Sequence, residues 1–377
     1  MVRLAGAALA QARTLAPEVR RALLDIASCR TAALGGHIDA CEACGDSRPS
    51  YNSCRNRHCP KCQSYRQALW VEARAERLLP THHFHVVFTL PALLRPVALR
   101  HRETVFDLMF AAVSETLADL ARDPKRLHAQ LAITLVLHTW SRDLGFHPHL
   151  HGIVSGGGLD LAEGQWVRAS DKLLFPVHVM GALFRGKMLD ALRKAHERGE
   201  IDLGQHDPIA LLAKLYRTRW IVYAKRPFGD AMHVVRYLGR YTHRVGISND
   251  RIESVAEDHV RFRTKHGKHA TLAPLEFLRR FSMHVLPPRF VKIRHFGLLA
   301  PANVRGRLEI ARRRLDETDT TRRPLASSKS SIPTSAVERL LALLGVDVRL
   351  CRRCGERARV RRPLPLPSRS PEPRDTS

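Results

Sequence analysis

The stretch from Leu131 to Leu159, LAITLVLHTWSRDLGFHPHLHGIVSGGGL, decides the expected fold. Its first part, 131–138, is a run of apolar and β-branched residues that predicts a strand. A polar segment leads into a second predicted strand at 149–155, which three consecutive glycines, 156–158, are expected to end. Two consecutive strands joined by a short polar segment predict an antiparallel hairpin.

The sequence on both sides of this hairpin adds helices and further strands. Apolar residues at intervals of three and four predict short helices in the first 36 residues and several longer helices later. The other predicted elements are a strand at 85–90, a hairpin that turns at Gly267, and helices at 66–80, 103–121, 176–198, 208–224 and 230–243. Because strands and helices alternate irregularly, we predict an α+β fold with a central antiparallel sheet flanked by helices.

A pair of histidines lies in the second strand of the hairpin. Side chains two apart on a strand point to the same face, so His149 and His151 can bind one divalent cation while Leu150 points into the core. A third ligand is needed, and His138, at the end of the preceding strand, is the nearest candidate, with a remote carboxylate or amide as the alternative. Chance spacing is the competing interpretation, because the chain holds 21 histidines.

A second pair with the same spacing, His83 and His85, is a rival for the metal site. The residues after it continue as a strand that looks buried, whereas His149 and His151 follow a loop and precede the glycines. We therefore favour His149 and His151.

Two tyrosines follow in the predicted helix at 230–243. Tyr237 and Tyr241 are four residues apart and would share one face of that helix. Such pairs are usually half-buried core, but Arg236, Arg240 and Arg244 add cations that suit phosphate. A tyrosine hydroxyl, with a pKa of roughly 10, is a poor nucleophile unless a metal polarises the phosphate. We therefore predict that the histidines and tyrosines form one site for phosphoryl transfer.

A cysteine-rich block precedes these motifs. The pairs Cys41 with Cys44 and Cys59 with Cys62 are both CxxC motifs, and two such pairs can give four thiolates to one tetrahedral Zn²⁺. The spacing predicts a zinc-ribbon-like module with a structural zinc ion. Surplus donors that could replace a ligand or help to hold a second ion are Cys54, His37 and His58.

The charge of the chain indicates a polyanionic partner. Its 377 residues include 62 Lys and Arg against 36 Asp and Glu, a formal net charge of +26. A soluble basic surface is the simpler alternative, but an excess this large favours nucleic acid. In the cysteine block Arg55, Arg57 and Lys61 lie among tyrosines, a mixture that suits DNA contacts. No apolar run reaches the roughly 18 residues of a membrane span, so membrane binding is disfavoured.

The first 16 residues favour an ordinary helix over a secretory signal, because their apolar stretch is short. Clustered cysteines at metal-ligand spacing favour a reducing cytoplasm over disulfides. Cys351 and Cys354 form an isolated CxxC that could bind metal only with donors from elsewhere. The expected organisation is a helical segment at 1–36, a zinc-binding module at 37–66, a nuclease domain at 67–255, an accessory DNA-binding segment at 256–314, a linker at 315–336, and a short helix with a disordered basic tail at 337–377.

At these motifs the chain resembles the HUH-type two-tyrosine transposases of rolling-circle insertion sequences, a family named for its histidine, hydrophobic residue, histidine motif. The resemblance extends from about residue 25 to 315. The segments that carry it are NSCRNRHCPKCQ (52–63), HFHVVFTLP (83–91), HPHLHGIVSGGGL (147–159), YLGRYTHRVGISNDRI (237–252) and VKIRHFGLL (291–299).

The resemblance implies that His149 and His151 bind Mg²⁺ or Mn²⁺ and that Tyr237 and Tyr241 are nucleophiles. Each tyrosine would form a covalent 5′-phosphotyrosine on single-stranded DNA and release a 3′-OH, so strands are rejoined without ATP or another nucleotide cofactor. One alternative is a rolling-circle replication initiator or relaxase, which the zinc module disfavours. The other is a zinc-dependent DNA-binding protein without enzymatic activity, in which the tyrosines are core and the histidines inert.

Overall fold

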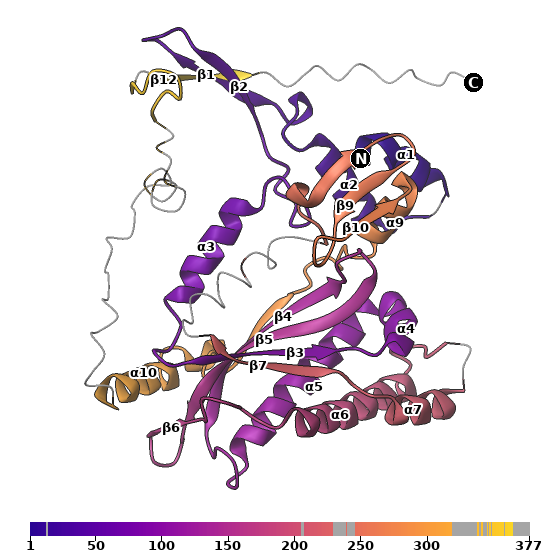
Figure 1. The fold of residues 1–377 in the computed structure, drawn as a ribbon, viewed down its shortest axis with the longest axis vertical. Helices are drawn as coiled ribbons and strands as arrows, with labels where there is room; N and C mark the ends of the chain where they lie inside the picture. Colours follow the sequence, from indigo (N-terminus) through magenta and orange to yellow (C-terminus); the bar gives the residue numbers. More distant parts are fainter. Residues whose placement is uncertain are drawn as a thin grey trace.

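The fold of the chain is α+β, which confirms the predicted class. The structure is a computed structural model, and its strands form three sheets in which all neighbours run antiparallel (Figure 1). It describes residues 1–12, 14–204, 207–228, 239 and 246–318, and towards the end of the chain 338, 341, 345, 347, 349–357 and 359–364.

The largest sheet carries the predicted hairpin at its centre. Its strand order is β11-β4-β5-β3-β7, and the short β6 pairs with the end of β5. These strands are β3 (His83–Thr89), β4 (Gln130–Trp140), β5 (Phe146–Leu159), β6 (Trp166–Arg168), β7 (Val222–Phe228) and β11 (Ile293–Gly297). The β4-β5 turn is short and closed by a hydrogen bond from Ser141 N to Gly145 O of 2.9 Å.

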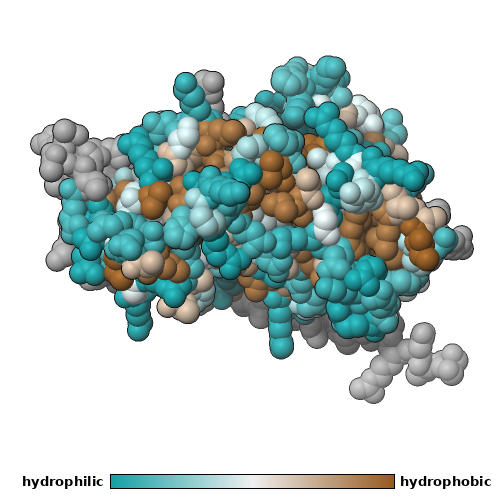
Figure 2. Space-filling model, turned by 90° about the horizontal axis from the view of Figure 1, so that it is seen from below, coloured by the Kyte–Doolittle hydropathy of each residue, from teal (hydrophilic) through white to brown (hydrophobic). Residues whose placement is uncertain are grey.

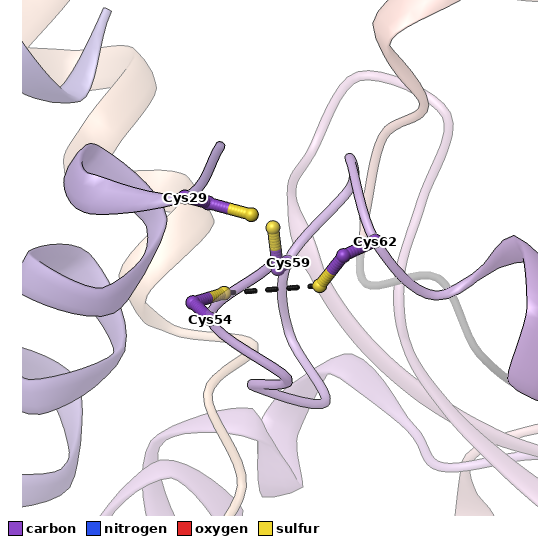
Figure 3. A group of neighbouring side chains, drawn as sticks. All are labelled: Cys29, Cys54, Cys59 and Cys62. Carbon is purple, nitrogen blue, oxygen red and sulfur yellow. Dashed lines mark hydrogen bonds between the residues drawn. The ribbon is translucent and has the colours of Figure 1, made fainter. Parts of the chain in front are cut away.

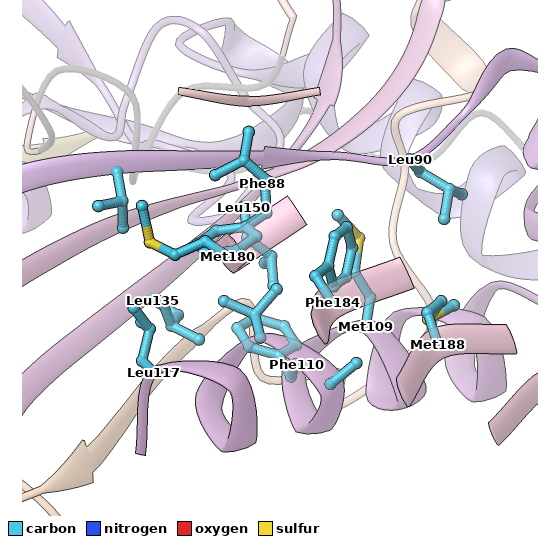
Figure 4. Close-up of a cluster of buried hydrophobic side chains, with 14 of the residues drawn as sticks. Phe88, Leu90, Met109, Phe110, Leu117, Leu135, Leu150, Met180, Phe184 and Met188 are labelled. Carbon is cyan, nitrogen blue, oxygen red and sulfur yellow. The ribbon is translucent and has the colours of Figure 1, made fainter. Parts of the chain in front are cut away.

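Helices cover one face of this sheet and form the main core with it (Figures 1 and 4). They are α4 (Arg95–Arg100), α5 (Arg102–Arg122), α6 (Val177–Glu197) and α7 (Pro208–Arg217). Side chains alternate along each strand, so Phe88, Leu135 and Leu150 all point to this face and meet Met109 and Phe184 from the helices. The surface seen from below in Figure 2 is mostly hydrophilic with separate hydrophobic areas, as amphipathic helices predict.

We expect the Leu135→Ala variant to lose about 2–5 kcal/mol of unfolding free energy, because Leu135 is fully buried and its removal leaves a cavity. The same substitution at Leu161, which is 52% exposed, should change stability by less than about 0.5 kcal/mol. Urea denaturation followed by circular dichroism measures both. Equal losses in the two variants would contradict the proposed core.

A second unit combines the first two helices with a later segment, residues 252–282. Its helices are α1 (Val2–Ala12), α2 (Pro17–Ser28) and α9 (Pro274–Ser282), and its sheet contains β8 (Ile252–Val255), β9 (Val260–Arg263) and β10 (His269–Leu272). Leu9, Leu23, Phe262 and Phe277 share its apolar core. The β9-β10 pair is the predicted hairpin around Gly267. The helical segment at 1–36 and part of the segment at 256–314 therefore pack together, unlike the predicted division.

The third sheet is a small ribbon of β1 (Gly36–Cys41), β2 (Ser47–Tyr51) and β12 (Arg359–Leu364). Helix α3 (Ser64–Ala75) leads from this region to the large sheet and lies on the face opposite α5, α6 and α7 (Figure 1). Helix α10 is Arg307–Thr318, and the 3-10 turns are η1 (Ala32–Leu34), η2 (Ala92–Leu94), η3 (Asn249–Arg251) and η4 (Pro301–Asn303). Among the described helices, none has both the length and the apolar character needed to cross a bilayer.

Three expected elements differ from the structure. The glycines at 156–158 lie inside β5 instead of ending it. The neighbouring strand passes so close that a Cβ at Gly158 would be 2.7 Å from the carbonyl oxygen of Gln130, so glycine is needed there. The helix expected at 208–224 ends at Arg217, and β7 begins at Val222, which is buried against the sheet core.

The carboxy-terminal segment is the third difference, because part of the expected disordered tail forms β12 by pairing with β1. The helix expected at 230–243 lies outside the described residues except for Gly239, and so does most of the expected linker at 315–336.

Candidate functional site

Three histidines meet on the face of the large sheet opposite the main core. Strand pairing sets His138 of β4 directly beside His149 of β5, and His151 follows two positions later on the same face. One ligand atom from each of the three imidazoles lies within 4.8 Å of the others. Among the described residues no carboxylate joins this group. The structure thus gathers the predicted pair and the predicted third ligand in one place.

Hydrogen bonds orient two of these imidazoles. The Nδ1 of His149 donates to the carbonyl oxygen of His147 at 2.6 Å, which leaves its Nε2 with a lone pair for a metal. The Nδ1 of His151 lies 2.8 Å from the Nε2 of His85, and the two rings are nearly parallel, 7° apart. When the Nδ1 of His151 is the donor in this contact, its Nε2 keeps a lone pair for the same metal ion. His149 is only half-buried and forms the open side of the cluster.

Burial keeps these imidazoles uncharged. Desolvation lowers the pKa of His149 to about 4 and holds the pKa values of His138 and His151 well below the ordinary 6.5. At neutral pH all three are therefore in the neutral form, which is the form that binds metal ions. The cluster can accept a cation without first losing protons.

The structure changes the interpretation of the rival pair. Both His83 and His85 lie on β3 on the same face as the cluster, because β3 is the neighbour of β5. His85 contacts His151, whereas the Nδ1 of His83 donates to the carbonyl oxygen of Thr81 at 2.9 Å. His85 therefore supports the other pair instead of competing with it. Only the register between β3 and β5 reveals this, so sequence reasoning missed it.

Helix α3 covers the sheet next to the cluster. Its residues Trp70 and Val71 pack against Val136 and Ile153, which flank His151 on the same face. Gly239 is helical and lies so close to α3 that a Cβ there would be 2.3 Å from Cγ2 of Val71. The predicted nucleophiles Tyr237 and Tyr241 and the predicted DNA-binding residues Arg236, Arg240 and Arg244 lie outside the described residues.

The cysteines form two groups that differ from the predicted set. Cys29, at the end of α2, lies with Cys54, Cys59 and Cys62 of the loop before α3, with sulfur atoms within 4.8 Å of one another (Figure 3). Cys41 and Cys44 are instead on the ribbon, where they meet Cys351 and Cys354. The expected set of Cys41, Cys44, Cys59 and Cys62 is thus corrected, because the ribbon carries its CxxC away from the loop.

Of the surplus donors, Cys54 joins the first group and His58 does not. The buried His58 accepts a hydrogen bond from the backbone N–H of Leu286 at 3.1 Å, and its pKa falls to about 3 through burial. His37 lies 3.5 Å from Asp39 on the ribbon. Cys29 was not among the predicted donors, and its only signal in the sequence is that eight cysteines make two complete sets of four.

The predicted DNA-binding residues of this loop differ in their exposure. Arg55 and Lys61 are exposed, so their roles in DNA binding stay predictions. Arg57 is half-buried and donates to the carbonyl oxygens of Phe290, at 2.7 Å, and Pro287, at 3.3 Å. Its guanidinium holds the loop against the segment before β11, and its expected contact with DNA stays a prediction.

Two family profiles match the chain. One, described as "Putative transposase", matches residues 132–307, and the other, described as "Transposase zinc-binding domain", matches residues 1–90. The second contains all of Cys29, Cys54, Cys59 and Cys62, so the match and the sulfur geometry both support structural Zn²⁺ at this group.

Two individual relatives extend the similarity. The chain is 40% identical over 359 residues to "Putative transposase y4qJ" of Sinorhizobium fredii, covering 92% of this chain and 89% of that protein. It is 28% identical over 285 residues to "Transposase for insertion sequence element IS801" of Pseudomonas savastanoi pv. phaseolicola, covering 72% of this chain and 68% of that protein. No solved structure matches the chain.

Proposed function

This chain belongs to the family of transposases that carry an amino-terminal transposase zinc-binding domain, and on that premise we propose that it nicks and rejoins single-stranded DNA through covalent 5′-phosphotyrosine bonds. The observation that carries the proposal is the cluster of three neutral imidazoles, His138, His149 and His151, on one face of the sheet. Insertion-sequence ends and target DNA would be its substrates in rolling-circle transposition.

The donor set fits a divalent metal ion. Neutral imidazoles suit first-row ions such as Mn²⁺ better than Mg²⁺, which prefers oxygen ligands. His138, His149 and His151 would hold the ion, with His149 on the side open to substrate. When bound, the ion would withdraw charge from the scissile phosphate and stabilise the charge that develops on it.

The tyrosines would supply the nucleophiles. The hydroxyl oxygen of Tyr237 or Tyr241 would lose its proton and attack phosphorus, the bond between phosphorus and the 3′ oxygen would break, and that oxygen would take up a proton and leave as a 3′-OH. The phosphate remains esterified to the tyrosine, so a 3′-OH can later attack it in reverse and rejoin the strands. Two tyrosines would allow cleavage at one DNA end to be followed by cleavage at another.

The position of Gly239 supports this pairing of motifs. Gly239 lies two residues from each tyrosine in the sequence, and a residue two positions away is within about 7 Å along the chain. Gly239 contacts Val71 of α3, which packs beside His151 on the sheet. This contact places Gly239 beside the face that carries His151, which supports the proposed pairing of the two motifs.

An adduct assay tests the proposal. The full chain would be incubated with labelled single-stranded oligonucleotides from the ends of its insertion sequence and Mn²⁺, and denaturing electrophoresis would detect covalent protein–DNA complexes. We expect an adduct that carries the 5′ phosphate side of the nick and a free 3′-OH on the other product. Strong DNA binding without any adduct would favour a DNA-binding protein without enzymatic activity, and the proposal would be wrong.

His85 provides a more specific prediction. Because its Nε2 lies 2.8 Å from the Nδ1 of His151, we propose that it is a positioning residue that holds that ligand in place. The His85→Ala variant should bind Mn²⁺ about 10–100-fold more weakly, measured by titration calorimetry, and His85→Gln should recover part of the affinity. The control is His83→Ala, a buried histidine of the same strand that does not contact the cluster, which should bind Mn²⁺ normally. Equal weakening by both variants would indicate general damage to β3.

A further inference from the structure

The two CxxC turns of the ribbon have the same backbone conformation. Gly45 and Gly355 follow the second cysteine of each turn and have positive φ angles, 69° and 80°, which glycine adopts without strain. In each turn the glycine N–H donates to the carbonyl oxygen of the first cysteine, at 2.9 Å for both Cys41 and Cys351. The N–H of each first cysteine donates to a carbonyl oxygen five residues later, that of Asp46 or Glu356, at 2.8 Å in both turns. The two turns thus have equivalent hydrogen bonds and equivalent glycine conformations.

The sulfur atoms of these turns face one another. The Cys41 and Cys354 sulfurs are 3.6 Å apart and the Cys44 and Cys351 sulfurs 3.7 Å, and all four lie within 4.8 Å. A tetrahedral Zn²⁺ with bonds of about 2.3 Å to sulfur separates its ligands by about 3.8 Å. Disulfides would need about 2.05 Å. The spacing therefore fits four thiolates around one zinc ion.

The strands beside these turns pair two segments that lie far apart in the sequence. Strand β12 pairs with β1 along its whole length, from Gly36 opposite Leu364 to Cys41 opposite Arg359. Asp39 of β1 forms ion pairs with Arg359 at 2.7 Å and Arg361 at 3.2 Å. The carboxy-terminal CxxC thus reaches the amino-terminal one as part of a regular sheet.

This ribbon has few buried apolar side chains to stabilise it. Among the described residues, no cluster of buried apolar side chains includes a residue of β1, β2 or β12. Cys41 and Cys351 are its buried side chains, 3% and 4% exposed. A sheet this small needs another source of stability, and a structural metal ion commonly provides it.

We infer that Cys41, Cys44, Cys351 and Cys354 form a second structural Zn²⁺ site, distinct from the group around Cys59, that fastens the carboxy-terminal segment to the amino-terminal ribbon. The zinc-binding domain match ends at residue 90 and so does not include half of these ligands. The ribbon is a zinc module whose two halves lie at opposite ends of the sequence. Its zinc closes the chain between them into a loop.

Zinc counting on the full chain tests the site. Elemental mass spectrometry of protein purified with zinc present should find two zinc ions per chain, one for each cysteine group. The Cys351→Ser/Cys354→Ser double variant should retain one. The control, Arg352→Ala/Arg353→Ala, changes exposed residues of the same turn that are not ligands and should retain two.

A second measurement tests whether the carboxy-terminal segment stays attached to the amino-terminal ribbon. A protease recognition sequence would be inserted between Ser327 and Ser328, and the cleaved protein run on a size-exclusion column. The carboxy-terminal fragment should elute with the rest of the chain when zinc is bound, and separately in the Cys351→Ser/Cys354→Ser variant. One zinc per chain in the unaltered protein, or disulfides found by thiol titration in place of the metal, would overturn the inference. Neither measurement depends on DNA cleavage. Failure of the second zinc site and failure of the phosphotyrosine proposal can therefore be told apart.

Discussion

Replacing both Tyr237 and Tyr241 with phenylalanine should abolish the covalent DNA adduct and lower nicking by at least about 10³-fold, because the reaction then has no nucleophile. Phenylalanine keeps the ring and removes only the hydroxyl, so affinity for single-stranded DNA should change by less than about threefold. Adduct formation on labelled oligonucleotides and a binding titration at fixed salt measure the two effects.

The matched control is Tyr223→Phe. Tyr223 is 50% exposed on β7, and its strand neighbours β3 on the sheet that carries the histidines. It therefore offers an accessible hydroxyl close to the cluster without belonging to the predicted pair. The control should form the adduct normally. Full nicking by the Tyr237→Phe/Tyr241→Phe variant would refute the assignment, and loss of the adduct in Tyr223→Phe would move the nucleophile to β7.

The second large effect is expected at the metal site. His149→Ala removes one of three ligands on the open side of the cluster, so Mn²⁺ binding and cleavage should both be lost, with a fall in nicking of about 10²–10⁴-fold. The zinc content of the variant should not change, because the cysteine groups contain no residue of this cluster. Nicking rates with increasing Mn²⁺ and elemental analysis measure the two quantities.

His178→Ala is the control for that variant. His178 is exposed on α6, on the opposite face of the sheet, and is not part of the cluster. It should nick DNA at the rate of the unaltered protein. If His149→Ala kept full activity and full Mn²⁺ affinity, the three histidines would not be the catalytic metal site.

Local pattern was sufficient for much of the fold. The strand at 131–138, the helix at 103–121 and the helix at 176–198 are present within a few residues of their predicted bounds, because each depends on the periodicity of its own apolar residues. The alternation of side chains along a strand also placed His149 and His151 on one face and Leu150 in the core. Both inferences depend only on the residues of one helix or one strand.

The structure differs from the sequence-based predictions where elements from distant parts of the chain meet. Closeness in sequence predicts one zinc set of Cys41, Cys44, Cys59 and Cys62, but Cys41 lies beside Cys354 in the ribbon and Cys59 beside Cys29 at the end of α2. The spacing of His83 and His85 predicts a rival pair, although the β3-β5 register brings His85 to His151. The guanidinium of Arg57 reaches carbonyl groups more than two hundred residues later in the sequence, which no local pattern indicates.

The sequence by itself determined the α+β class, the histidine pair on one strand face and the basic, cysteine-rich character of the chain. Tertiary structure alone decided how the eight cysteines divide into two groups and which other histidines reach His151. The physical reason is that periodicity and residue spacing act over a few residues of one element. Strand register and the packing of one segment on another are set by contacts between residues that the sequence keeps far apart.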